Sequence, residues 1–257
     1  MVNTLLRYPG GKTRAIKYLK EYIPNGIKEL CSPFFGGGAL EIYLVKERNI
    51  KIYCYDRFDY LINFWNCVKH NKNNLVKEIK KLHPISKEAF KEYKKLLSCD
   101  KLDNITKASY FFAINRSSYS GCTLSGGFSK TAANQRFTKS SIDRVQKFNS
   151  DKLIFKCLDF SQSIPLHPKT FLYLDPPYYL GKKSNLYGKG GDLHKNFDHV
   201  KLFNILNKRN EWLLSYNNCD YIRNLYKDYK IIELDWKYGL TKNKDKKSKE
   251  IIILSNN

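Results

Sequence analysis

Runs of apolar, β-branched and aromatic residues recur along the chain, and stretches of helical periodicity separate several of them. Each run is six or seven residues long, a typical length for a strand. Strands that alternate with helices are typical of a parallel sheet covered by helices, so the pattern predicts an α/β fold with a seven-stranded sheet. A helix is predicted from Gly38 to about Arg48. The predicted strands are residues 26–31, 51–56, 152–157, 170–175, 211–216, 229–235 and 250–255.

The pattern changes between Asp56 and about Ser150, where helical periodicity continues without a convincing strand. We therefore predict that residues 57–150 form an inserted, mainly helical domain, and that residues 1–56 and 151–257 together build the sheet. Within the insertion, residues 117–137 are rich in Ser, Gly and Thr and too long for an ordinary connection, which is typical of functional or disordered loops. The helical patterns are residues 59–69, 73–82, 86–97, 104–115 and 138–148.

The charge balance points to a polyanionic partner. The 257 residues include 46 Lys and Arg against 24 Asp and Glu, a formal net charge of +22, which exceeds what an unspecialised surface needs. Frequent Lys and Asn are also typical of AT-rich genomes, so part of this charge reflects composition. Six lysines lie in residues 237–249, and we expect this run to attract a nucleic acid without sequence preference.

Cysteine and histidine usage argues against disulfides and metals. The seven cysteines are spread singly, without a C-x-x-C pair, which suits reduced thiols in a cytoplasm. The five histidines show no metal-ligand spacing, so no metal is expected. No apolar run resembles a signal peptide or approaches the roughly 18 residues that span a bilayer. We expect a cytoplasmic protein with no membrane partner, as a monomer or weak dimer.

The first candidate site is the glycine triplet of CSPFFGGGALE, residues 31–41, which follows a predicted strand and opens a predicted helix. Glycine lets the backbone turn sharply and approach a ligand, as in nucleotide-binding α/β proteins. Asp56 ends the next strand, 20 residues after Gly36, where a carboxylate can accept hydrogen bonds from a ribose. A plain turn with Asp56 as a helix N-cap is the alternative. Together the two features favour an adenosine-type cofactor.

RYPGGKT, residues 7–13, ends like a phosphate-binding loop, but Leu6 stands where that motif requires glycine. We instead expect a turn that brings Lys12 and the ring of Tyr8 to the cofactor. An ordinary surface turn is the alternative.

The most specific signal is the tetrapeptide DPPY, Asp175 to Tyr178, directly after a predicted strand. Two prolines remove two N–H donors, so the backbone there offers only acceptors. Asp175 and a nearby carbonyl could accept from one exocyclic amino group while the Tyr178 ring stacks on its heterocycle. Such acceptors favour a tetrahedral nitrogen that can attack a sulfonium methyl group. This interpretation requires that no internal ion pair consumes the Asp175 carboxylate; the alternative is a Pro-rich strand exit.

In this order, RYPGGK, SPFFGGGA, Asp56, NRSSYSG (residues 115–121) and DPPY resemble the Dam-type (D12, alpha-class) DNA adenine N6-methyltransferases. The resemblance implies S-adenosylmethionine as methyl donor, adenine in duplex DNA as acceptor, and a Rossmann-like methyltransferase sheet. It also implies that residues 1–56 and 151–257 are the catalytic domain, and that 57–150 is a target-recognition domain inserted into it. A bacterial cell or a virus-infected cell is then the expected location.

The resemblance also assigns residues to roles. Asp175, Pro176, Pro177 and Tyr178 would hold a flipped adenine. The cofactor-binding residues would be Tyr8, Lys12, Phe35, Gly36, Gly38, Asp56, Asp159, Phe160 and Asp175. The DNA-binding residues would be Asn115, Arg116, Tyr119, Ser120 and Arg136.

Base extrusion costs a few kcal/mol, and an inserted aromatic ring replaces part of the lost stacking. The resemblance gives Tyr119 this insertion and gives Arg116 the DNA backbone or the orphaned base. A ring packed on its own domain is the alternative for Tyr119. Arg136 could contact either guanine or phosphate.

At three places the sequence departs from the family pattern, which limits the roles that the resemblance can assign. Ser32 replaces an acid that could bind the methionyl amine, so that contact is expected to pass to a backbone carbonyl. Tyr8 replaces a frequent Trp. Residues 121–138 do not resemble the arm of GATC-specific members, so no recognition sequence is predicted. Two alternatives remain: an RNA or N4-cytosine methyltransferase with the same site, and a catalytically silent DNA-binding protein.

Overall fold

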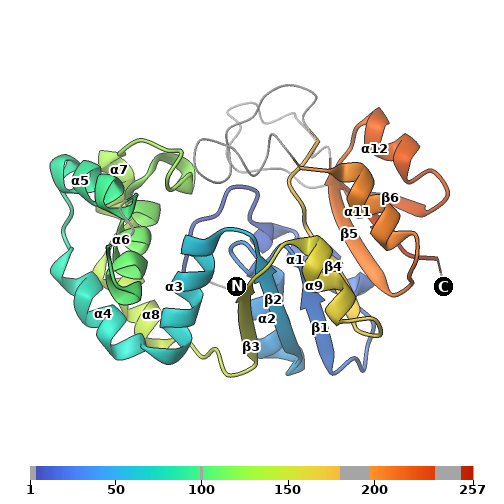
Figure 1. The fold of residues 1–257 in the computed structure, drawn as a ribbon, viewed down its shortest axis with the longest axis horizontal. Coiled ribbons are helices and arrows are strands. Elements are labelled where there is room, and N and C mark those ends of the chain that lie inside the picture. Colours follow the sequence, from blue (N-terminus) through green and yellow to red (C-terminus); the bar gives the residue numbers. More distant parts are fainter. Residues whose placement is uncertain (1–3, 99–100, 180–196, 235–249, 257) are drawn as a thin grey trace.

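The computed structural model describes residues 4–98, 101–179, 197–234 and 250–256. Its centre is a seven-stranded sheet of strand order β3-β2-β1-β4-β5-β7-β6 (Figure 1). All seven predicted strands are present; β4, β5 and β7 are buried almost throughout, whereas the edge strands β3 and β6 are only partly buried. The strands are β1 (Glu29–Ser32), β2 (Lys51–Asp56), β3 (Leu153–Cys157), β4 (Phe171–Leu174), β5 (Trp212–Asn217), β6 (Lys230–Leu234) and β7 (Glu250–Leu254).

The prediction of a parallel sheet is wrong for the last strand. β7 pairs antiparallel with both of its neighbours, β5 and β6, whereas β1 to β5 pair in parallel. Consecutive strands can pair antiparallel without a crossover element, and apolar periodicity alone carries no information on direction. The first residue of β7, Glu250, therefore lies opposite Asn217 at the C-terminal end of β5.

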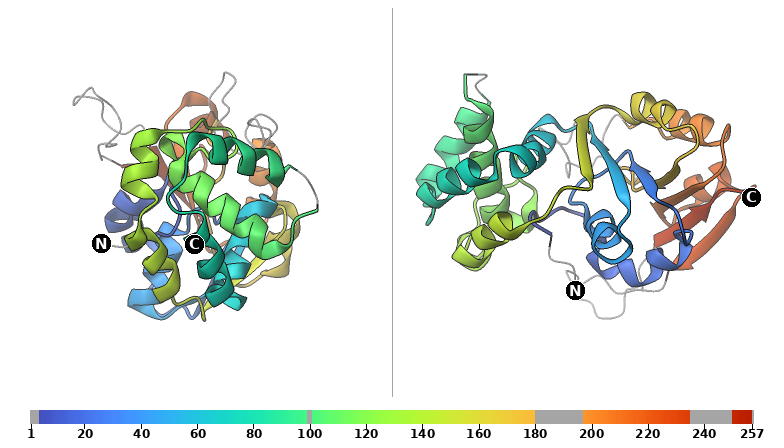
Figure 2. Two further views of the ribbon diagram at one scale, coloured as in Figure 1. Left: turned by 90° about the vertical axis from the view of Figure 1, so that its left-hand side faces the viewer. Right: turned by 90° about the horizontal axis from the view of Figure 1, so that it is seen from below.

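Helices cover both faces of the sheet (Figure 2). Leu30 and Tyr173 belong to a core that includes residues of α1 and α2, while the adjacent Cys31 and Leu172 belong to a second core with α9, α11 and α12. This alternation follows from the two-residue period of a strand. The helices are α1 (Ile16–Leu19), α2 (Ala39–Arg48), α9 (Phe160–Ser163), α11 (His199–Leu206) and α12 (Asp220–Leu225), with short 3₁₀ turns at η1 (Lys12–Arg14), η2 (Lys20–Tyr22) and η4 (Ile164–Leu166).

Residues 57–150 form the helical group at one end of the sheet (Figure 1). The five predicted helices are present, and residues 130–136, predicted as part of a loop, form a sixth. Ser129 caps this helix by accepting a hydrogen bond from the Ala132 N–H at 3.2 Å. The elements are α3 (Asp59–His70), α4 (Lys72–Lys81), α5 (Lys87–Leu97), α6 (Asn104–Ser117), η3 (Tyr119–Gly121), α7 (Lys130–Arg136) and α8 (Lys139–Lys147).

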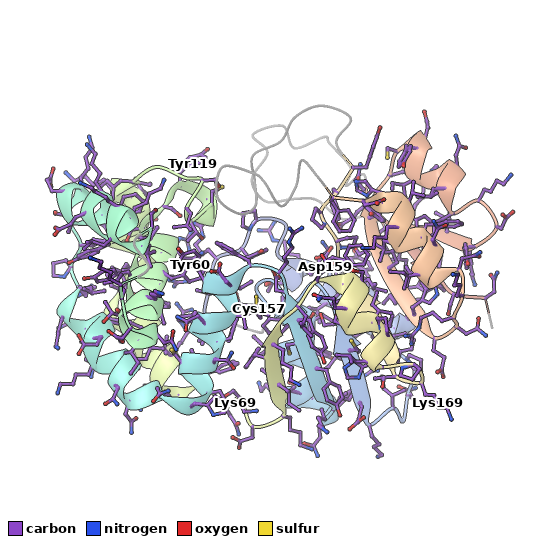
Figure 3. All side chains as sticks on the ribbon, viewed as in Figure 1. Tyr60, Lys69, Tyr119, Cys157, Asp159 and Lys169 are labelled. Carbon is purple, nitrogen blue, oxygen red and sulfur yellow. The ribbon has the colours of Figure 1, made fainter. Side chains whose placement is uncertain are left out.

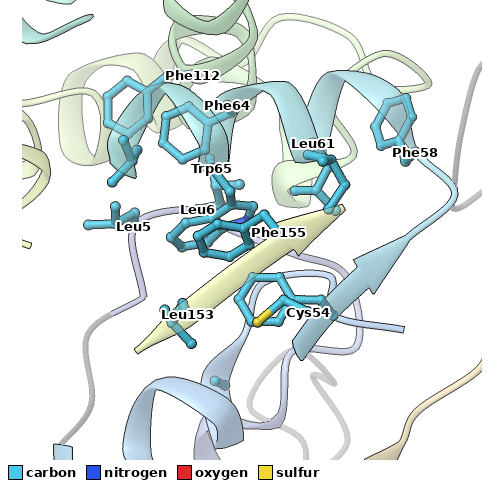
Figure 4. Packing of buried hydrophobic residues seen from close by; sticks show 14 of the residues in the cluster. Leu5, Leu6, Cys54, Phe58, Leu61, Phe64, Trp65, Phe112, Leu153 and Phe155 are labelled. Atoms are coloured by element: carbon cyan, nitrogen blue, oxygen red, sulfur yellow. The ribbon is translucent and has the colours of Figure 1, made fainter. Parts of the chain in front are cut away.

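Helix α3 joins the helical group to the sheet through one continuous core (Figure 4). On its sheet side, Trp65 stacks on Phe155 of β3 with ring centroids 5.5 Å apart. On its other side, Phe64 stacks on Phe112 of α6 at 5.6 Å. Buried aromatic pairs of this kind stabilise the packing beyond their buried area. The position of α6 relative to the sheet is therefore set by packing.

Candidate functional site

The strand order places the site. β1 and β4 are neighbours at the centre of the sheet, with β2 beyond β1 and β5 beyond β4, so the order reverses between them. Ligands of open α/β sheets bind at such a switch point, outside the carboxyl ends of the strands. The glycine loop follows β1, Asp56 ends β2 and Asp175 follows β4. All three line one cavity of about 1170 Å³.

The glycine loop is shaped by close packing and by left-handed backbone. Gly36 and Gly38 have φ of +50° and +65°, which disfavour residues with a Cβ. A Cβ on Gly36 would lie 2.9 Å from the Tyr8 ring, and one on Gly38 would lie 2.3 Å from the Phe35 ring. The ring of Tyr8 therefore lies against the loop at the edge of the cavity.

Asp56 ties this loop to the start of α3. Its Oδ2 accepts the Gly36 N–H at 3.0 Å, and its Oδ1 accepts the Phe58 N–H at 2.9 Å. The N-cap of α3 is Phe58, so Asp56 bridges two segments instead of capping that helix. Burial raises the pKa of Asp56 to about 6, against the opposing effect of these N–H donors. A desolvated carboxylate in this position can accept from ligand hydroxyls.

Lys12 lies at the DPPY motif, beneath the turn of RYPGGK. Its Nζ is 2.8 Å from Asp175 Oδ1 and 3.1 Å from Glu250 Oε1, and it donates to the Tyr178 hydroxyl at 2.7 Å. The Lys12 side chain is only 5% exposed, which is not the position of a surface turn. Sequence reasoning missed Glu250, because nothing near it in the sequence marks it as close to Asp175.

The Asp175 carboxylate is therefore paired, but it still faces the cavity. Its side chain is 21% exposed, and both Asp175 and Pro177 line the cavity. Burial raises its pKa, while Lys12 lowers it. A ligand amine at this position would share Asp175 with Lys12. Pro176 and Tyr178 are not among the lining residues; Tyr178 lies against Lys12 and Tyr216.

A second carboxylate that sequence reasoning missed lies beside the glycine loop. Ser32 Oγ donates to Glu41 Oε1 at 2.6 Å, and Glu41 lines the cavity from the first turn of α2. Burial raises the pKa of Glu41 to about 7, and the hydrogen bond from Ser32 opposes this. Glu41 therefore supplies a carboxylate next to the position where Ser32 lacks one. Its place in the glycine-rich motif, one helical turn after Gly38, was the available signal.

The remaining residues predicted to bind the cofactor also line the cavity. Phe35 packs against Trp65 and Phe155 with ring centroids 5.3 Å away in both cases. Asp159 caps α9 by accepting the Ser161 N–H at 2.9 Å (Figure 3). Phe160 is buried against other aromatic rings.

Asn115 and Tyr119 differ sharply in exposure. Asn115 is fully buried: its Oδ1 accepts the Arg7 N–H at 2.8 Å, and its Nδ2 donates to the Arg7 carbonyl at 2.7 Å. Its side chain is placed to hold the N-terminal segment, with no face toward a ligand. Tyr119 is 71% exposed, so it is not packed on its own domain (Figure 3). Ser120 beside it lines the cavity, with φ of +51°.

Comparison with known proteins identifies the chain. The D12 class N6 adenine-specific DNA methyltransferase family matches residues 8–240. The chain belongs to this family. It is 25% identical to the type II methyltransferase M.MjaIII of Methanocaldococcus jannaschii, covering 90% of each chain. It is 24% identical to M.CviBI of Paramecium bursaria Chlorella virus NC1A, covering 91% of this chain and 90% of the relative. It is also 24% identical to the retron Ec67 DNA adenine methylase of Escherichia coli, covering 99% of this chain and 92% of the relative.

The methyltransferase gathers four arginines on the wall of the cavity that its helical region and N-terminal segment form. Burial, together with the charges of Arg144, Arg7 and Arg136, lowers the pKa of Arg116 to about 9. Among the described residues, none of the four forms an ion pair, and the Nε of Arg144 is buried without a hydrogen-bond partner. Arg116 and Arg136 were predicted; Arg7 and Arg144 were not.

Some predictions fall outside the described residues of the enzyme. These concern the lysine run 237–249 and the last residue of the predicted strand 229–235. Within the described ranges, no helix is both long and apolar enough to cross a membrane. The same ranges contain no group of three or more His, Cys, Asp or Glu side chains placed to hold a metal ion.

Proposed function

We propose that this methyltransferase transfers the methyl group of S-adenosylmethionine to N6 of an adenine that is flipped out of duplex DNA. In this proposal residues 1–56 and 151–257 are the catalytic domain, and residues 57–150 are the target-recognition domain. The observation that carries it is the meeting of the glycine loop, Asp56 and Asp175 in one cavity at the switch point of the sheet.

The residues of the cavity fit the cofactor. S-adenosylmethionine carries a ribose diol, an ammonium group and a sulfonium, and it supplies an electrophilic methyl group when bound. In this proposal Asp56, which holds the glycine loop, accepts from the diol, and the buried Glu41 takes the ammonium group. The rings of Tyr8, Phe35 and Phe160 provide apolar walls. A cation would also lower the cost of burying these carboxylates, whose pKa values are raised.

The DPPY motif is proposed to hold the adenine amino group. Asp175 accepts one N6 hydrogen, and the proline-rich backbone supplies a second acceptor without a competing donor. The N6 lone pair then forms a bond to the methyl carbon as the carbon–sulfur bond breaks and leaves its electron pair on sulfur. A proton leaves N6. The two acceptors stabilise the tetrahedral nitrogen of the transition state more than the planar ground state.

The opposite wall is proposed to hold DNA. Tyr119 is the most exposed large hydrophobic side chain in the described part of the chain, as a ring that enters a base stack must be. Arg116, Arg136, Arg7 and Arg144 are placed for phosphates or base edges, and the net charge of +22 favours the duplex at longer range. Asn115 supports Arg7 through its backbone, and Ser120 turns the chain beside Tyr119.

We also place the enzyme in the cytoplasm of a bacterial or virus-infected cell, as a monomer or weak dimer. The six cysteines in the described residues are free thiols, which suits a reducing compartment. Partition of the enzyme with a fractionated host lysate and its elution volume in size-exclusion chromatography test this placement. Recovery from the periplasm or as a stable higher oligomer would contradict it.

The test is transfer of a labelled methyl group to duplex DNA, followed by digestion to nucleosides. Label in N6-methyladenine supports the proposal, and label in N4-methylcytosine or only in RNA supports the alternatives. Calorimetry with S-adenosylmethionine separates a catalytically silent DNA-binding protein from an enzyme. Expression in a methylation-deficient host, with mapping of modified adenines by single-molecule sequencing, gives the recognition sequence.

A further inference from the structure

The first residue of β7, Glu250, contacts Lys12 beside the DPPY motif. Because β7 runs antiparallel to β5, its N-terminal residue lies at the sheet edge where the carboxyl ends of β4 and β5 meet. A parallel β7 would have placed Glu250 at the opposite edge. Glu250 is 1% exposed, and its Oε1 lies 3.1 Å from Lys12 Nζ.

Lys12 joins this carboxylate to the DPPY motif. Its ammonium group contacts Glu250 on one side and Asp175 on the other, at 2.8 Å, and donates to the Tyr178 hydroxyl at 2.7 Å. A buried lysine needs one carboxylate for neutrality, but this one has two. With both carboxylates ionised, the three side chains carry one net negative charge.

We propose that Glu250 is a positioning residue for methyl transfer: it fixes the ammonium group of Lys12 against Asp175 and leaves the cluster one net negative charge beside the adenine amino group. This role rests on the proposed function. The amine nitrogen becomes positive as its lone pair forms the bond to carbon, and the carbon–sulfur pair stays on sulfur. The proton released from N6 passes to the Asp175 carboxylate and then to water. A net negative cluster stabilises the developing positive charge and this proton transfer.

Within the part of the chain that the structure describes, few charged groups act on Glu250. Its neighbours across the sheet, Asn217 on β5 and Leu234 on β6, are neutral. Among the described residues, the titratable groups that act on it are Lys12 and Asp175. The buried Tyr173 hydroxyl lies within the field of the same groups, and the charge of Glu41 also raises its pKa. Burial raises the pKa of Glu250 to about 7, so acidification below that value makes the cluster neutral.

The experiment compares Glu250→Gln, which keeps the shape and removes the charge, with Glu250→Asp, which keeps the charge. Single-turnover transfer at saturating S-adenosylmethionine and DNA should slow roughly 10-fold in Glu250→Gln and recover in part in Glu250→Asp. The affinities for S-adenosylmethionine and DNA, measured by calorimetry, should stay within about 2-fold. The loss of rate below about pH 7 should be weaker in Glu250→Gln. Glu233→Gln, on exposed neighbouring strand β6, is the matched control and should behave as wild type.

A double-variant cycle shows whether Glu250 acts through Lys12. In a Lys12→Met background, Glu250→Gln should add little further loss, because the charge that Glu250 holds is absent. Equal losses in both backgrounds, or a wild-type rate for Glu250→Gln in an active enzyme, would overturn this role alone. Wild-type protein that binds S-adenosylmethionine but methylates no DNA would overturn the proposed function, and this role with it.

Discussion

The two walls of the cavity carry opposite charge. The wall at the sheet edge holds the carboxylates of Asp56, Glu41 and Asp175, whose pKa values burial raises. The wall formed by the helical region and the N-terminal segment holds four arginines, and burial lowers the pKa of Arg116 among them. On each wall, desolvation favours the neutral form of the ionisable side chains. Perturbations of this kind concentrate at functional sites, where a ligand of opposite charge offsets the cost.

The difference in charge between the two walls suggests that the two proposed ligands, S-adenosylmethionine and DNA, bind on different sides of the cavity. A carboxylate wall suits a cofactor with ammonium and sulfonium charges, and an arginine wall suits phosphates. The two sides also differ in internal bonding. Asp56, Glu41 and Asp175 are each hydrogen-bonded or ion-paired within the protein, which prepares their geometry. Arg116 donates to the backbone carbonyls of Arg136 and Leu5, but none of the four arginines forms an ion pair among the described residues, so no carboxylate there neutralises their charge.

The largest expected effect is on the carboxylate wall. Asp175→Ala should lower methyl transfer to DNA by roughly 10³-fold or more, because it removes the acceptor that favours the tetrahedral nitrogen. Labelled-methyl transfer measures this, with calorimetry to show that the cofactor still binds. Asp220→Ala, at the first turn of α12 and outside the cavity, is the control. Near-normal turnover of Asp175→Ala would remove the proposed mechanism.

Next to Ser120 of the arginine wall, Tyr119→Ala should lower the transfer rate roughly 10-fold on matched duplex DNA, because the inserted ring no longer offsets the cost of unstacking. A mismatched target base is already weakly stacked and paired, so its rate should be largely restored. The ratio of the two rates is the measurement. An equal defect on both substrates would show that Tyr119 acts elsewhere.

The contribution of the arginines should appear in the salt dependence of the affinity for DNA. Arg144→Gln should reduce the slope of log affinity for DNA against log salt by about 1 if Arg144 contacts one phosphate. Lys147→Gln removes the same charge from an exposed position one turn further along the same helix, outside the cavity, and should change the slope less. Slopes come from fluorescence anisotropy titrations at several salt concentrations. Equal slopes for Arg144→Gln and wild type would assign the arginine wall to something other than phosphate.

What the sequence predicted well is local. The strands are continuous apolar runs, and the glycine loop, Asp56 and DPPY are short motifs next to strand ends, so their meeting at one sheet edge follows from the fold. The helix at residues 130–136 was not predicted, because Ser, Gly and Thr dominate the sequence around it, although Ser129 is a standard N-cap residue.

What the sequence did not predict depends on pairing across the fold. The direction of β7 is invisible to periodicity, and Glu250 enters the site only because of that direction. Arg144 lies on the cavity side of α8, one turn from the exposed Lys147, and a sequence pattern does not show which face meets the cavity. Arg7 and Glu41 lay within motifs that were recognised, but their roles depend on neighbours that only the structure supplies.

The smallest expected effect is on stability. Glu41 and Glu250 have pKa values raised to about 7 in the folded protein, from an ordinary 4.5, and that of Asp56 is raised to about 6 from 3.8. The folded state thus binds more protons than the unfolded state between about pH 4.5 and 7, so the stability that these groups contribute is lost as pH rises through that range.

When the pH falls from 8 to 6, these groups should therefore raise the free energy of unfolding of the cofactor-free enzyme by on the order of 2 kcal/mol. The gain should be seen as a higher Tm at pH 6. Glu41→Gln cannot titrate, so it should remove part of this dependence, whereas Glu47→Gln, on the exposed side of the same helix, should not. Saturating S-adenosylmethionine should flatten the curve as well, because its positive charge favours the ionised carboxylates. A cofactor that raises Tm equally at both pH values would mean that it is held without these carboxylates, and the charge contrast between the two walls would then have no part in cofactor binding.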